Sequence, residues 1–126
     1  MRAVLDTSVL IGGLAEPVDA ELAISTISLA ELHFGVLVAK SPQVRAERLR
    51  RVAAIERAFE PLPVTDAVAR TYGALAAAVV AVGRQPRSRA FDLVIAATAA
   101  THEAVLYTRN PKDFVGLDDH LQVIAV

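Results

Sequence analysis

The opening stretch, residues 1–10, reads MRAVLDTSVL and decides the fold. Its run Ala3-Val4-Leu5 is short and wholly apolar, which is typical of a strand buried on both faces. Asp6 and the two hydroxyl residues behind it stop the strand and favour the start of a helix. A strand that ends on a carboxylate predicts an α/β fold with Asp6 at the carboxyl edge of the sheet, where ligands bind in such folds.

Strand-like and helical segments alternate along the rest of the chain. Strands are predicted at residues 22–25, 61–64, 105–108 and 121–126, and helices at residues 9–14, 28–40, 42–59, 66–82 and 90–103, with a turn at 109–114. Ser28 and Glu31 have the spacing of a capping box, so one helix is expected to begin at Ser28. The alternation predicts a short, mostly parallel central sheet flanked by helices.

Composition limits the class of protein. The 126 residues suffice for one domain, taken here as residues 1–126, with a 54% hydrophobic share for its core. The absence of cysteine excludes disulfides, thiolate zinc sites and cysteine nucleophiles. No signal peptide or membrane-length apolar stretch is evident, so a cytoplasmic protein is expected. Aromatic residues make up 5%, which argues against a base-stacking platform for single-stranded nucleic acid.

Charge is segregated although the net charge is only −1. Residues 1–39 carry a net charge of −4, and residues 40–57 carry +4. The basic helix predicted over residues 42–59 either binds phosphates or is a solvated face, and we favour the solvated face.

Four carboxylates occupy positions that suggest a binding role, either at the end of a predicted strand or within an apolar helix, where burying a charge costs free energy. Asp6 and Asp113 follow predicted strands, whereas Glu31 and Asp92 interrupt helical segments that are apolar almost all round. Gathered in one dry place the four would repel each other, and a divalent cation resolves that repulsion. An all-oxygen ligand set suits Mg²⁺ or Mn²⁺, and the chemistry would be metal-assisted hydrolysis of a phosphodiester.

Each acid also has a purely structural interpretation. Asp6 could cap the next helix, Glu31 could complete the capping box, and Asp92 could be a first-turn carboxylate favoured by the helix dipole. Asp113 could be a solvated turn residue. These roles are compatible with metal binding, and the four acids together are more informative than any one.

The chain resembles PIN-domain ribonucleases, specifically VapC-type toxins of type II toxin–antitoxin (VapBC) pairs. Four motifs in family order carry the resemblance: residues 4–10, 28–32, 92–99 and 108–114. The resemblance implies a PIN fold and a Mg²⁺- or Mn²⁺-dependent endoribonuclease. It further implies a homodimer and a cognate VapB-type antitoxin that neutralises the enzyme. Asp6, Glu31, Asp92 and Asp113 match the family's catalytic, metal-binding acids.

Further residues match supporting positions. Thr7, Ser8 and Thr108 match hydroxyl positions that hold an acid or a metal-bound water, and Asn110 stands where related sequences sometimes place an acid, so Asp113 could contact the metal directly or indirectly. Arg84, Arg87, Arg89, Arg109 and Lys112 flank the motifs and are candidates to hold RNA phosphates. The interval from Asp6 to Glu31 is short for the family, which leaves any loop-based substrate preference open. His33, His102 and His120 have no mutual ligand spacing and are expected to be structural.

Three rival functions remain at this level. A haloacid-dehalogenase-like or receiver-like phosphoryl-transfer domain also places an Asp after a strand, but the dehalogenase-like pattern needs a second Asp where this chain has Ser8. A catalytically silent PIN-fold binding module is opposed by the presence of all four acids. A PIN nuclease of RNA processing stays open, although the short chain favours a toxin.

Overall fold

A parallel sheet forms the centre of the molecule, as the alternation of segments predicted. In the computed structural model, which describes all 126 residues, its strands are β1 (Arg2–Leu5), β2 (Glu21–Ala23), β3 (Val105–Thr108) and β4 (Val123–Ala125). They are ordered β2-β1-β3-β4, and every neighbouring pair is parallel. Val4 of β1 pairs with Ala23 on one side and Leu106 on the other, so β1 is an inner strand.

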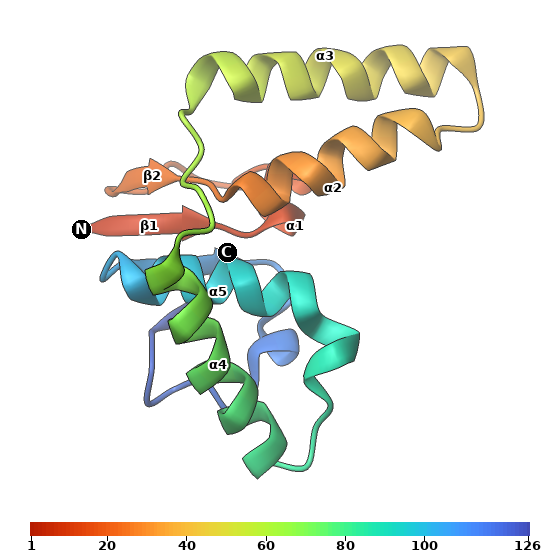
Figure 1. Cartoon of the computed structure of the whole chain (residues 1–126). Helices are drawn as coiled ribbons and strands as arrows, with labels where there is room; N and C mark the ends of the chain where they lie inside the picture. The colour runs from red at the N-terminus through yellow and green to blue at the C-terminus, as the bar shows by residue number, and fades with distance from the viewer.

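Helices cover both faces of this sheet (Figure 1). They are α1 (Thr7–Gly12), α2 (Thr26–Leu37), α3 (Pro42–Ala58), α4 (Asp66–Ala81) and α5 (Ala90–Thr101), with short 3-10 helices η1 (Pro86–Arg89) and η2 (Pro111–Phe114). The α2–α3 hairpin lies over one face and the α4–α5 pair over the other, which gives three layers (Figure 1).

Strand residues alternate between two hydrophobic clusters because successive strand side chains point to opposite faces. Val4 and Leu106 belong to the cluster that contains the buried residues of α4 and α5. Ala3, Leu5 and Tyr107 belong to the cluster beneath α2 and α3. Burial on both faces explains why β1 and β3 are apolar along their length rather than alternating with polar residues.

The start of α2 differs from the sequence prediction. Ser25, not Ser28, is the N-cap, and its hydroxyl accepts from the backbone N–H of Ile27 at 3.1 Å. Ser25 forms an isolated parallel bridge with Leu62, and this pairing holds Ser25 in the extended conformation that an N-cap needs. The prediction of a capping box between Ser28 and Glu31 was therefore wrong, because a contact distant in sequence fixes the earlier start.

Two other segments also differ from their predicted form. Residues 61–64 form no regular strand, because Pro61 and Pro63 on either side of Leu62 have no backbone N–H to donate. Residues 111–114, expected as a turn, form the 3-10 helix η2. The first helix begins at Thr7 rather than at residue 9, because Asp6 itself is its N-cap.

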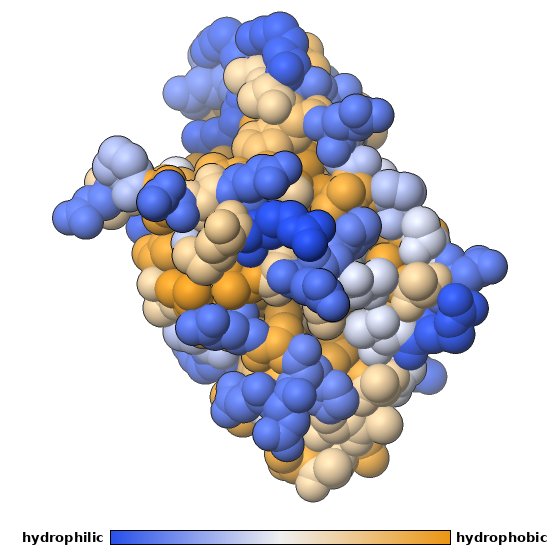
Figure 2. Space-filling view, turned by 90° about the vertical axis from the view of Figure 1, so that its left-hand side faces the viewer, coloured by the Kyte–Doolittle hydropathy of each residue, from blue (hydrophilic) through white to orange (hydrophobic).

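The surface around the amino ends of the strands is mixed in character. Figure 2 views this side of the molecule and shows hydrophilic side chains spread over it, with smaller hydrophobic areas between them. None of the helices is long and apolar enough to cross a membrane. The carboxyl ends of the strands, where the four acids were expected, lie on the opposite side.

Candidate active site

The candidate site lies at the point where the chain changes the side of β1 on which it adds strands. The chain passes from β1 to β2 at one edge and then returns to β3 on the other side of β1. In open α/β sheets ligands bind beyond the carboxyl ends of strands at such a point. Asp6 directly follows β1, and Thr108 is the last residue of the neighbouring β3.

Asp6 is fixed by hydroxyl groups. Its side chain is only 5% exposed, and its Oδ2 accepts from the Thr108 hydroxyl at 2.6 Å and the Ser8 hydroxyl at 3.0 Å. Backbone N–H groups support both hydroxyls, since Arg109 N donates to Ser8 Oγ at 3.1 Å and Asn110 N to Thr108 Oγ1 at 3.0 Å. This network orients the carboxylate with neutral donors and leaves its negative charge uncompensated.

Glu31 is oriented in the same manner from the neighbouring helix. The Thr7 hydroxyl donates to Glu31 Oε1 at 2.8 Å and lies 2.9 Å from the hydroxyl of Ser28. Because Thr7 has one hydroxyl proton, Ser28 must be the donor of the second bond. Ser28 therefore supports the site from inside α2 instead of capping that helix.

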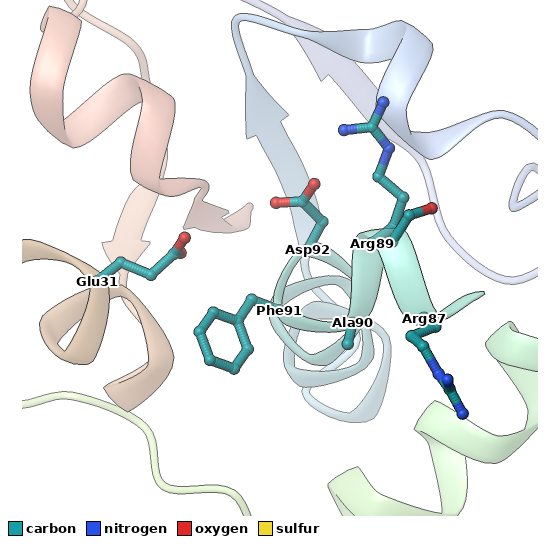
Figure 3. Close-up of a pocket in the computed structure, with 7 residues that line it drawn as sticks. Glu31, Arg87, Arg89, Ala90, Phe91 and Asp92 are labelled. Carbon is teal, nitrogen blue, oxygen red and sulfur yellow. The ribbon is translucent and has the colours of Figure 1, made fainter. Parts of the chain in front are cut away.

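Asp92 shows that the acids share one electrostatic environment. It lies in the first turn of α5, and the pKa of its carboxyl is raised from 3.8 to about 6. Burial is the largest cause, followed by the negative charges of Asp6, Asp113 and Glu31, while Arg89 lowers the pKa. Figure 3 shows the carboxylates of Glu31 and Asp92 directed from α2 and α5 toward the same open space.

Asp113 differs from the other three acids because it has a cationic partner. Its Oδ1 lies 3.2 Å from Nη2 of Arg89, in an ion pair that joins η2 to the end of η1. Elsewhere, the side chains of His33 and Glu56 form a hydrogen bond of 2.8 Å that joins α2 to α3. Asp6, Glu31 and Asp92 thus have no ion-pair partner, although the charge of Arg89 lowers the pKa of Asp92.

A cleft opens beside two of the four acids, Glu31 and Asp92, whereas Asp6 and Asp113 do not line it. The acidic cleft, as we name it, has a volume of about 350 Å³ and is lined by Glu31 and by residues 87–92 (Figure 3). A second depression, which we name the α3 depression, has a volume of about 220 Å³ and shares Glu31 with the acidic cleft. Its other lining residues are Ile11, Leu32, Gly35, Arg48, Arg51 and Val52. Arg48 and Arg51 of the basic helix therefore line the same depression as Glu31, which charge counting along the sequence did not reveal.

The remaining basic candidates lie around the rim. Arg87 and Arg89 line the acidic cleft, whereas the Arg109 side chain packs over the backbone of Gly12. Arg84 donates to the backbone carbonyl of Lys112 at 2.9 Å and so links η2 to the chain before η1. Of the predicted phosphate-binding residues, Arg87 and Arg89 are the ones that line the cleft.

The donor set suits a hard cation, but it is not preassembled around one. Carboxylate oxygens are the ligands that Mg²⁺ and Mn²⁺ prefer. As the side chains stand, however, no three histidine or acidic residues form a group that could hold a metal ion. The raised pKa of Asp92 shows proximity and repulsion of the acids rather than coordination geometry.

Comparison with known proteins agrees with the geometry. The sequence profile of the PIN domain matches residues 3–118. Ribonuclease VapC4 of Mycobacterium tuberculosis is 34% identical over 131 residues, which cover 99% of this chain and 97% of the relative. The chain belongs to the PIN-domain family, as a VapC-type member.

A second curated relative and a solved structure support this family assignment. Ribonuclease VapC5 of Mycobacterium tuberculosis is 38% identical over 121 residues, which cover 91% of this chain and 87% of the relative. The crystal structure of VapBC-5 of Mycobacterium tuberculosis, a member of the VapBC family of toxin–antitoxin systems, superposes with a TM-score of 0.86 at 37% identity. That match covers 100% of this PIN domain and 98% of the other chain. The resemblance based on sequence motifs is thereby confirmed.

Proposed function

We propose that this PIN domain, residues 1–126, is a Mg²⁺- or Mn²⁺-dependent endoribonuclease toxin that a cognate VapB-type antitoxin neutralises. The observation that carries the proposal is the set of four carboxylates at one sheet edge, three of which raise the pKa of the fourth, Asp92. A divalent cation would relieve the mutual repulsion of carboxylates concentrated in this way. The names of the relatives supply ribonuclease activity as the reaction.

Asp6, Glu31, Asp92 and Asp113 would hold the metal. A divalent cation, when bound, neutralises phosphate charge and lowers the pKa of a coordinated water. The protein's own part is to orient the acids: Thr108 and Ser8 hold Asp6, and Thr7 holds Glu31. Asp113 is paired with Arg89 through Oδ1, so its second oxygen, Oδ2, would be the atom available to a metal.

Arginines on the cleft would bind the RNA backbone. Arg87 and Arg89 line the same cleft as Asp92, and Arg51 lies in the adjoining α3 depression. Guanidinium groups bind phosphate oxygens in a bidentate manner, which positions the strand without reading its sequence. Arg109 and Lys112 are exposed and would add to the attraction from the rim.

The proposed partners follow from the relatives. The similar structure from Mycobacterium tuberculosis is of a toxin–antitoxin system, so an antitoxin is the expected protein partner. The homodimer that the resemblance to VapC-type toxins implied and the cytoplasmic location are further parts of the proposal. The metal-free acids would attract a cationic side chain of the antitoxin, which would block the site by occupying the place of the metal.

A cleavage assay tests the proposal. The purified protein should cleave cellular RNA in Mg²⁺ or Mn²⁺ and stop on addition of EDTA, and cleavage mapping would identify the RNA. Asp6→Asn should abolish cleavage with an unchanged circular dichroism spectrum, while Asp119→Asn, at an exposed acid of a turn, should cleave normally. RNA cleavage by the Asp6→Asn protein at the wild-type rate would refute the role of Asp6, and cleavage in EDTA would refute metal dependence.

A further inference from the structure

Phe91 is an exposed aromatic residue at the acidic cleft. It precedes Asp92 in the first turn of α5, is 55% exposed and lines the cleft. Single exposed apolar residues are common on protein surfaces, so exposure alone carries no argument. The place of Phe91, in the lining of the cleft beside Asp92 and Glu31, is what requires an explanation.

The other aromatic residues are disposed differently. Phe114 and Tyr107 are buried, and Tyr72 and Phe59 are partly buried. Phe34 is the other strongly exposed aromatic at 66%, but it lines none of the depressions around the acids. Phe91 is thus the aromatic residue available to a ligand in the cleft.

The acidic cleft has an aromatic side chain on one side of Asp92 and two basic side chains on the other. In Figure 3 the ring of Phe91 lies on the side toward Glu31, whereas Arg87 and Arg89 lie on the other side of Asp92. The arginines suit phosphates, and the flat apolar ring suits the face of a nucleobase. Their arrangement complements a single strand whose backbone follows the arginines and whose base turns toward Phe91.

We propose that Phe91 stacks on a nucleobase of the RNA next to a phosphate held by Arg87 and Arg89, and so fixes the strand in the acidic cleft. The proposal rests on the proposed ribonuclease function and extends it to recognition of a single-stranded segment with an unpaired base. A base inside a duplex is stacked on its neighbours and cannot present its face to a side chain.

This role is compatible with the scarcity of aromatic residues. A platform that stacks several successive bases needs several aromatic residues, and the composition argues against one. A single stacking residue needs only one ring, and it fixes one base beside the cleavage position.

The test compares two strands and four proteins. Fluorescence anisotropy in Ca²⁺ would measure the binding of a labelled 12-nucleotide oligo(A) RNA and of an abasic strand of equal length. The proteins are wild type, Phe91→Ala, Phe91→Trp and, as a matched control at an exposed Phe, Phe34→Ala. Phe91→Ala should weaken binding of oligo(A) roughly 5- to 100-fold and leave binding of the abasic strand unchanged. Phe91→Trp and Phe34→Ala should bind both strands as wild type does.

Other results would overturn the proposal. Equal losses on the two strands would mean that Phe91 supports the cleft rather than a base, and unchanged binding would remove its role altogether. A lower assembly mass in light scattering with unchanged RNA binding would assign Phe91 to a protein interface instead. The proposed function fails separately: wild-type protein that binds oligo(A) but cleaves no RNA would contradict ribonuclease activity while the stacking contact stands.

Discussion

Replacement of Asp92 by Asn is expected to stabilise the metal-free protein at neutral pH. The pKa of Asp92 lies at about 6, above its ordinary value of 3.8, because of burial and the charges of Asp6, Asp113 and Glu31. The difference corresponds to roughly 3 kcal/mol between the two protonation states. Since the side chain is half-buried, solvent screening reduces the expected gain in unfolding free energy to ~1–2 kcal/mol.

The sign of the pH dependence follows from linkage. Between pH 3.8 and about 6 the folded state binds more protons at Asp92 than the unfolded state, so the contribution of Asp92 to stability falls as pH rises through this window. Asn carries no charge at any pH. The advantage of Asp92→Asn should therefore be absent below pH 3.8, grow through the window and be complete above about pH 6.

Urea unfolding in EDTA, followed by circular dichroism at several pH values, measures this difference. Asp119→Asn serves as the control and should match wild type throughout. An excess of Mn²⁺ should reverse the order, because the metal stabilises the protein that retains its full set of ligands. A variant no more stable than wild type at pH 7.5, or an advantage that persists at pH 3.5, would refute the reasoning.

Three further predictions concern the surroundings of the acids. Thr108→Val removes the hydroxyl that donates to Asp6, and it should lower the unfolding free energy by ~1 kcal/mol and weaken Mn²⁺ binding in calorimetry. Thr108→Ser should restore both the stability and the Mn²⁺ affinity. An unchanged Mn²⁺ affinity of Thr108→Val would contradict the role of Thr108 in positioning Asp6. Arg89→Ala removes the cation that lowers the pKa of Asp92, so NMR titration of that carboxyl should give a value above 6, and a lower value would be inconsistent with the assignment. In a complex with the antitoxin, a basic side chain of the partner, expected to be Arg, should lie among the four acids, and a structure with no partner cation there would disprove this mode of inhibition.

The sequence alone predicted the architecture correctly and identified three of the acids as candidate site residues. Ala3-Val4-Leu5 before Asp6 predicted a buried strand that ends at the sheet edge, because apolar runs of this length are stable as inner parallel strands. Glu31 and Asp92 were identifiable because a carboxylate on an all-apolar helix is costly unless it is balanced. These inferences depend on local burial, which a pattern of residue types reports directly.

The tertiary structure decided the contacts between segments distant in sequence. The bond from Thr108 to Asp6 joins the ends of two strands, and the pairing of Ser25 with Leu62 moved the start of α2 away from Ser28. Likewise, the pairing of Arg89 with Asp113 depends on how η1 and η2 pack. No spacing rule reports such contacts, because they depend on the order of strands in the sheet and on the packing of helices against it.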